Sequence, residues 1–554
     1  MNRRVPLFVA VGAALLLYGC SSTRQTVESN RKQPPLFKGM GGHHYEVTTA
    51  SNMAQRYFDQ GLTWSYAFNH DEAIRSFTEA TRLDPECAMA WWGIALCNGP
   101  HINNPILPPD RAAAAWDALQ QAVTLKGRVT PKERALITAL QERYGNPPPE
   151  DRAPLDRAYA DAMREVWRTY PDDSNIGALF AEAMMDLRPW DLWKKDGTPQ
   201  PGTEEVLATL EQVFHQDPLN PLANHLYIHA VEASPHPTMA NAAADRLRDM
   251  VPASGHLTHM PSHIDVLTGR WAQASAQNER AIKADRKYTD MSPKQGFYRL
   301  YMIHNHHMLS FAAMMQGRSK VAIRSAREVV DSVPKDYAHT ESALVDPYMH
   351  AKYDVLKRFG LWDEILAEPA PPSFLRITTA MWRFDRGLAF ANKKQLDNAE
   401  RERAAFEDAV LKIPDDAMMA INPAKTILSI ARHMLDAEIE YHSGRSDAAI
   451  ESLKKAVAVE DSLIYMEPPE WVQPVRHTLG AILLSAGRYG EAETVYRADL
   501  RKWPGNGWSL FGLARSLHGQ GKAAEAKIVE ARFNKAWSNA DTKILSSCLC
   551  VPKT

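Results

Sequence analysis

The chain has 554 residues, of which 45% are hydrophobic and 23% are charged, so it can bury a large core and is not a wholly disordered polypeptide. Its 64 lysines and arginines nearly balance 66 aspartates and glutamates, which argues against nucleic acid and against an anionic membrane surface as partners. Five cysteines are too few for a disulfide scaffold.

The first 19 residues are predicted to be a signal peptide. A basic MNRR segment precedes the apolar run VPLFVAVGAALLLY, which is shorter than the roughly 20 residues of a membrane-spanning helix. The sequence Leu17-Tyr18-Gly19-Cys20 resembles the cleavage box of bacterial lipoproteins, which implies that Cys20 is lipidated. Because Ser21 rather than aspartate follows, the resemblance implies a periplasmic protein anchored in the outer membrane of a bacterial cell envelope. An uncleaved membrane anchor is the alternative. Residues 20–45, with RKQPP and GGHH, are expected to form a flexible tether.

The remaining chain is predicted to be all α. Helical patterns alternate with short turns from Met53 onward, without a run of alternating strand residues. Residues 54–85 match the tetratricopeptide pattern of roughly 34 residues, and the matching positions are Gly61, Ala73, Phe77, Ala80 and Pro85. The same frame recurs near the C-terminus at Leu479, Gly480, Ala492, Tyr496 and Pro504.

The chain therefore resembles tetratricopeptide repeat proteins over most of residues 54–540. The resemblance implies an α-solenoid, a right-handed superhelix of helix pairs with a concave groove lined by the first helix of each pair. We divide the body into an N-terminal solenoid at residues 46–370, C-terminal repeats at 371–540 and a tail at 541–554. Insertions near residues 98–110, 186–203 and 285–302 are candidates for lids over the groove.

Eight imidazole and carboxylate side chains are concentrated in three successive segments, NHLYIHAVE, HLTHMPSHI and YMIHNHHM. Within each segment they are spaced three, four or seven residues apart, so they share one helix face. They are His225, His229, Glu232, His256, His259, His263, His304 and His307. In the tetratricopeptide frame all eight fall on positions that line the groove. The same count gives three secondary candidates, Glu182, His350 and Asp354.

These residue types predict a transition-metal site. Neutral imidazoles and carboxylates are ligands for zinc, iron or copper, and helices roughly 8 to 10 Å apart can direct side chains to a common ion. Eight groups exceed the needs of a single ion, which leaves room for two. Glu232 is the candidate general base or bridging carboxylate.

We interpret the protein as a metal-dependent enzyme, a hydrolase or an oxidoreductase, that acts on a small molecule or peptide in the groove. The chain has no Walker loop, dinucleotide fingerprint, nucleophile elbow or HExxH motif. One alternative is a non-enzymatic scaffold that binds a protein partner in the cell envelope, and another is metal storage or delivery. The segment 465–471 is a candidate wall of the groove, and Cys548 and Cys550 are close enough in the tail to pair.

Overall fold

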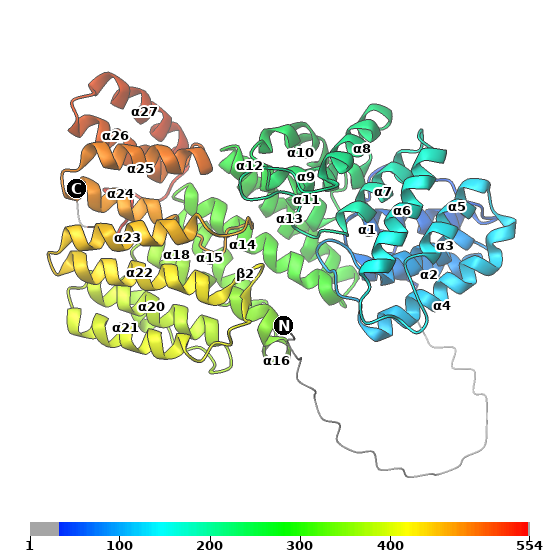
Figure 1. Cartoon of the computed structure of the whole chain (residues 1–554), viewed down its shortest axis with the longest axis horizontal. Coiled ribbons are helices and arrows are strands. Elements are labelled where there is room, and N and C mark those ends of the chain that lie inside the picture. The colour runs from blue at the N-terminus through cyan, green and yellow to red at the C-terminus, as the bar shows by residue number, and fades with distance from the viewer. Residues whose placement is uncertain (1–32, 552–554) are drawn as a thin grey trace, which may run out of the picture. The chain divides into compact units, whose positions relative to one another are not determined.

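The structure is a computed structural model that describes residues 33–551 (Figure 1). The predicted signal peptide and Cys20 lie outside the described residues. In the first half of the chain the helices are α1 (Asn52–Tyr66), α2 (His70–Leu83), α3 (Ala88–Asn98), α4 (Pro109–Leu125), α5 (Pro131–Gln141), α6 (Ala153–Thr169), α7 (Ser174–Met185), α8 (Thr203–Gln216), α9 (Pro221–Glu232), α10 (Asn241–Leu247), α11 (Gly255–His259), α12 (Pro261–Leu267) and α13 (Trp271–Met291).

The second half continues in the same way, as Figure 1 shows in green to red. Its helices are α14 (Arg299–Met315), α15 (Ser319–Asp331), α16 (Lys335–Thr340), α17 (Ser342–Val345), α18 (Ala351–Arg358), α19 (Trp362–Ala367), α20 (Arg376–Asn392), α21 (Leu396–Val410), α22 (Ala424–His442), α23 (Ser446–Glu460), α24 (Val475–Ser485), α25 (Tyr489–Lys502), α26 (Gly507–Gly519) and α27 (Ala523–Ala536). Short 3-10 turns occur at Lys126–Arg128, Pro237–Ala240, Gly296–Tyr298 and Asp346–Tyr348.

Among the described residues, the only strands are β1 (Met418–Met419) and β2 (Asn422–Pro423). Each has two residues, and they pair antiparallel. Consecutive helices pack as pairs, such as α1 with α2, α20 with α21 and α22 with α23. The all-α solenoid prediction is confirmed. Between residues 33 and 551, no helix combines the length and hydrophobicity that crossing a membrane requires.

The same packing unit builds both ends of the solenoid. A Cβ atom on Gly61 or on Gly93 would lie 2.7 Å from the ring of Phe77, so that ring fits only between two glycines on neighbouring helices. Tyr496 is held in the same way, because a Cβ on Gly480 or Gly512 would come within 2.3 Å of its ring. The helices approach closely because the second helix of one pair inserts an aromatic side chain between two first helices.

The segment before α1 is part of the folded body, in contrast to the tether expected up to residue 45. The backbone N–H of Phe37 donates to Oε1 of Gln60 at 2.8 Å, and Nε2 of His43 lies 2.9 Å from Oδ1 of Asn175. Tyr45 is buried. These residues pack on α1 and α7, so the body begins at Pro35, where the compact unit starts.

The described residues from Pro35 onward belong to one compact unit. Long-range contacts join its parts: the indole N–H of Trp271 donates to the carbonyl of Pro504, and that of Trp508 donates to the carbonyl of Met314. The tail also packs on the body, where Cys548 and Cys550 form a buried disulfide.

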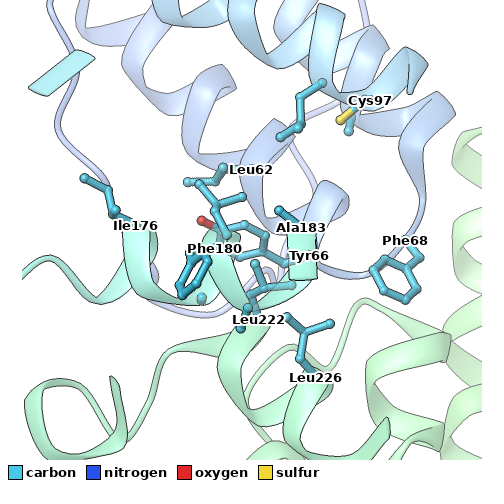
Figure 2. Close-up of a cluster of buried hydrophobic side chains, with 14 of the residues drawn as sticks. Leu62, Tyr66, Phe68, Cys97, Ile176, Phe180, Ala183, Leu222 and Leu226 are labelled. Carbon is cyan, nitrogen blue, oxygen red and sulfur yellow. The ribbon is translucent and has the colours of Figure 1, made fainter. Parts of the chain in front are cut away.

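A cluster of buried hydrophobic side chains fixes the helix that carries the first histidines. Figure 2 shows Leu62 and Tyr66 of α1 together with Phe180 of α7 and with Leu222 and Leu226 of α9. All five are buried. The cluster holds α9 against the C-terminal end of α1, and this placement brings the backbone of Tyr66 beside the histidine face of α9.

Candidate metal centre

Four helices, α9, α11, α12 and α14, supply the histidines. Asn220 caps α9 by accepting from the N–H of Ala223 at 2.9 Å, and Ser254 caps α11 by accepting from Leu257 at 3.2 Å. Pro261 separates α11 from α12, but Met260 between them keeps helical angles of φ −48° and ψ −39°. His259 and His263 therefore remain one turn apart on a common face.

The first triad consists of His225, His229 and His256, which are all buried. Nε2 of His225 lies 3.1 Å from Nε2 of His229 and 3.1 Å from Nε2 of His256. Two of the other ring nitrogens have acceptors: Nδ1 of His225 is 2.8 Å from the carbonyl oxygen of Tyr66, and Nδ1 of His229 is 2.8 Å from Oε1 of Glu232. Nδ1 of His256 has no hydrogen-bond partner among the described residues. Three Nε2 atoms thus converge on one point.

The second triad consists of His259, His263 and His304. Nε2 of His259 lies 2.7 Å from Nε2 of His263, and the rings of His259 and His304 are 4.6 Å apart. Nδ1 of His259 is 2.7 Å from Oδ1 of Asn278, whose amide nitrogen donates to the carbonyl of Ala274. In each triad the ligand nitrogens all lie within 4.8 Å of one another.

Glu232 connects the two triads. Its Oε1 faces Nδ1 of His229 in the first triad, and its Oε2 lies 2.6 Å from Nδ1 of His263 in the second. Burial alone would raise the pKa of this carboxyl, but its interactions with His263 and His229 outweigh burial and leave the pKa lowered. An ionised Glu232 accepts a hydrogen bond with each oxygen, so it orients two imidazoles.

The hydrogen-bond partners determine which nitrogen of each ring carries the proton. Carbonyl and carboxylate oxygens only accept, so the Nδ1 atoms of His225, His229, His259 and His263 carry the proton. Their Nε2 atoms then present lone pairs, which face each other at 3.1 Å in the first triad and at 2.7 Å in the second. Facing lone pairs repel, and a cation placed between them removes the repulsion. Both triads therefore fit metal ions.

Burial keeps the imidazoles in the neutral form that a metal requires. It is the largest cause that lowers the pKa of His225, His256, His259 and His304 well below the usual value, and the neighbouring histidines add to it. Neutral imidazole is the form that binds transition metals.

The structure brings together seven of the eight predicted residues, and His307 is the exception. Its ring lies one turn beyond His304 on α14, 5.9 Å from the ring of Tyr348. It is close to two of the secondary candidates, His350 and Asp354, which are 3.3 Å apart. Oδ1 of Asp354 also accepts from Nζ of Lys357 at 2.9 Å. This second buried group lies beside the triads and shares no ligand atom with them.

The third secondary candidate, Glu182, also lies apart from the triads. It is on α7, near the buried ion pair in which Arg143 Nη2 lies 2.6 Å from Asp186 Oδ2. Burial raises the pKa of Glu182 to about 7, although the charge of Arg143 opposes that shift.

Sequence reasoning missed several residues that complete the site. Oε1 of Glu467 lies 3.2 Å from Nδ1 of His263, and burial together with the charge of Glu232 raises its pKa well above the usual value. The ring of Phe68 lies 4.4 Å from that of His225, and Trp190 lies 5.4 Å from His229. The predicted wall at residues 465–471 pointed to Glu467 without giving it a role, whereas Phe68 carried no signal.

Backbone strain is concentrated at the same place. Among the described residues, four non-glycine residues have positive φ, and three of them border the triads or the adjoining cavity: Phe68 at 55°, Trp190 at 62° and Ala420 at 48°. Such conformations cost on the order of 1 to 3 kcal/mol each and cluster at functional sites. The positive φ values therefore indicate that these side chains are held in place at a cost in folding stability.

A cavity of about 370 Å³ opens beside the triads. Imidazoles of His229, His256, His263 and His304 reach it, so it borders both groups. The three insertions noted in the sequence all contribute to its lining, through Ile102, Trp190 and Phe297 among others. Met466 and Glu467 of the predicted wall line it as well. Residues of all three insertions therefore line the cavity beside the histidines.

These features define a helical-repeat protein with a buried polyhistidine centre. A sequence model of the tetratricopeptide repeat family matches residues 59–98 and 477–541, so the chain contains tetratricopeptide repeats. No curated protein matches the sequence.

Comparison with solved structures gives long but loose matches. A structure of the APC/C hetero-tetramer Cut9-Hcn1 is 13% identical, with 87% of this chain and 76% of that chain covered and a TM-score of 0.31. The human IFIT1 dimer with m7Gppp-AAAA is 12% identical, with 89% and 92% covered and a TM-score of 0.32. At such low scores, these matches add nothing to the functional argument.

Proposed function

We propose that the protein is a metal-dependent enzyme whose two histidine triads each hold one transition metal ion. The observation that supports this most directly is the pair of facing Nε2 lone pairs in each triad. The partners Tyr66, Glu232 and Asn278 all require the Nδ1 atoms to be protonated, so no proton is available between the facing nitrogens. A buried site with this arrangement is built for a cation.

Three imidazoles form a ligand set that leaves a coordination position open for water or substrate. An ion bound in this way supplies a Lewis acid or an activated water or oxygen, which accommodates both the hydrolase and the oxidoreductase hypotheses. The chain's own contribution is positional. Glu232 fixes the orientation of His229 and His263, while Phe68 and Trp190 cover the imidazoles and exclude solvent.

The scaffold alternative receives less support from the site. A peptide-binding groove needs an open surface, whereas loop residues such as Ile102, Trp190 and Met466 enclose these histidines in a cavity. Metal storage or delivery also uses histidines, but it gives no reason for a ligand-sized cavity beside the triads. A lipid anchor at Cys20 and a periplasmic location complete the proposal, and both rest on the N-terminal sequence alone.

The test is a metal count on the full-length protein by mass spectrometry after reconstitution with zinc, iron or copper. We expect two equivalents in the wild type, one in His256→Ala and one in His259→Ala, and almost none when both are replaced. His215→Ala, which changes an exposed histidine on α8, is the matched control and should retain both ions. Fewer than 0.2 equivalents of each metal in the folded wild type would refute the proposal.

A further inference from the structure

The cavity beside the triads has a polar end formed by imidazoles. His229 and His256 belong to the first triad, and His263 and His304 belong to the second, and all four line it. A molecule in the cavity therefore reaches both groups at once. Glu467, which lies 3.2 Å from His263, is the only carboxylate among the lining residues of the described chain.

The remaining walls are mostly apolar, and the lining also includes the polar residues Asn103, Tyr301 and His307. Aromatic rings come from Trp190, Phe297 and Tyr348, and aliphatic side chains come from Ile303 and Val345. The contributing segments are separated in sequence, since they lie before α8, before and within α14, and around α17. A ligand that fills this space buries mostly apolar surface, which stabilises binding by about 25 cal/mol per Å² before ordering costs.

Away from the triads, the cavity lining disfavours an anionic group. No lysine or arginine is among the lining residues in the described part of the chain, and the one acidic side chain among them is Glu467. A phosphate or carboxylate group entering the apolar part would lose its hydration without gaining a cationic partner. An uncharged ligand has no such cost.

The volume limits the size of the ligand. A buried apolar cavity of roughly 150 Å³ accommodates benzene, and the present cavity has about 370 Å³. The space therefore suits one or two ring-sized groups, at the small end of the range of about 300 to 1,000 Å³ typical of small-molecule sites. A folded or extended peptide of several residues does not fit.

We propose that the cavity binds an uncharged, largely apolar small molecule of one or two rings, whose single polar group faces the imidazoles. This inference deepens the proposed metal-dependent function by naming the class of its substrate. Binding of the apolar part does not need the ion, because the walls that contact it lie outside the triads.

The test uses two probes of the same shape on the full-length protein. 4-Phenylphenol is uncharged at pH 7, and 4-phenylbenzoate is anionic. Isothermal titration calorimetry on the chelator-treated protein should give a Kd for the phenol at least tenfold lower than that for the benzoate. Equal or tighter binding of the benzoate, or binding of neither probe, would overturn the inference.

A cavity-blocking variant and a control locate the binding. Leu344 lines the cavity and is 40% exposed, so Leu344→Trp can place an indole in the cavity without repacking the core. We expect it to weaken phenol binding by tenfold or more. Leu411→Trp changes a leucine that is 79% exposed and lies outside the cavity lining, and it should bind like the wild type. An unchanged Kd in Leu344→Trp would place the phenol elsewhere and overturn the inference.

The metal content of the same samples separates the two proposals. A protein that binds the phenol but no metal supports the cavity inference and refutes the metal-dependent function. A protein that holds two ions but binds no phenol supports the metal-dependent function and refutes the cavity inference.

Discussion

Replacing Glu232 by glutamine tests whether one carboxylate supports both triads. The amide of Glu232→Gln has nearly the same shape, but it has only one accepting oxygen. It can therefore accept from the Nδ1–H of either His229 or His263, and its NH₂ group faces the other ring. That second imidazole must carry its proton on Nε2, which removes the lone pair that binds the ion.

The magnitude follows from the number of histidines affected. Loss of a hydrogen-bond partner behind a ligand weakens metal binding by roughly 10- to 100-fold, which is about 1.4 to 2.7 kcal/mol. In Glu232→Gln we expect about a tenfold loss at the triad that keeps the oxygen, because a neutral amide is a weaker acceptor. At the other triad we expect a loss of about 100-fold or more.

Asn278→Ala is the matched comparison, because Asn278 contacts only His259 of the second triad. Asn278→Ala should lower the affinity for the ion in the second triad and leave the affinity of the first triad unchanged. Competition with a chelator of known affinity, followed by a metal count, measures both sites. Wild-type affinity for both ions in Glu232→Gln would show that the carboxylate does not position the ligands, and equal loss at both triads in Asn278→Ala would show that the triads are not separate.

Three further predictions concern stability. Phe77→Ala should lower the free energy of unfolding by about 3 to 5 kcal/mol in denaturant titrations, because the glycines on either side cannot fill the space; a loss below 1 kcal/mol would contradict the packing described. The metal-free protein should lose stability as pH falls below 6.5, because burial lowers the pKa of His70 to about 3 and that of His307 to about 4 while the unfolded chain takes up protons near 6.5. Each of these two histidines contributes about 1.4 kcal/mol of unfolding free energy per pH unit. In the metal-free His70→Gln variant, the free energy of unfolding should therefore fall less steeply between pH 6 and 4.5. The same steepness as in the wild type would argue against a neutral buried His70 ring. Arg358→Met should leave the free energy of unfolding unchanged or raise it by up to about 4 kcal/mol in the same titrations. The guanidinium nitrogens of Arg358 have no hydrogen-bond partner among the described residues, and the buried carboxylate of Asp499 already accepts from three other donors. Destabilisation by more than 1 kcal/mol would show that the buried cation is needed.

The sequence predicts the repeats and the histidine face because both depend on local spacing. Gly61 and Phe77 occupy fixed positions of a repeat, and His225 and His229 are one turn apart on one helix. Such relations are set by helix geometry and can be read without coordinates. The convergence of three segments then follows from the stacking of adjacent repeats.

The rest of the site depends on long-range contacts that the spacing of residues in the sequence does not reveal. Glu467 reaches His263 from more than 200 residues away, and Phe68 and Trp190 reach the imidazoles from loops with positive φ. His307 lies on the same face of its helix as His304. Spacing along a helix shows which face a side chain occupies, but it does not show which neighbouring side chains that residue will reach. One further turn carries its ring past the second triad to Tyr348.

The late position of Glu467 in the chain constrains how the centre matures. During synthesis all six imidazoles of the two triads leave the ribosome before residues 465–471, which supply one wall of the cavity. A nascent chain can therefore present a complete set of nitrogen ligands while that side is still open to solvent. If the triads bind metal as proposed, we expect the cavity to close only once the last repeats have folded, and a chain truncated after α21 to bind metal ions with less selectivity.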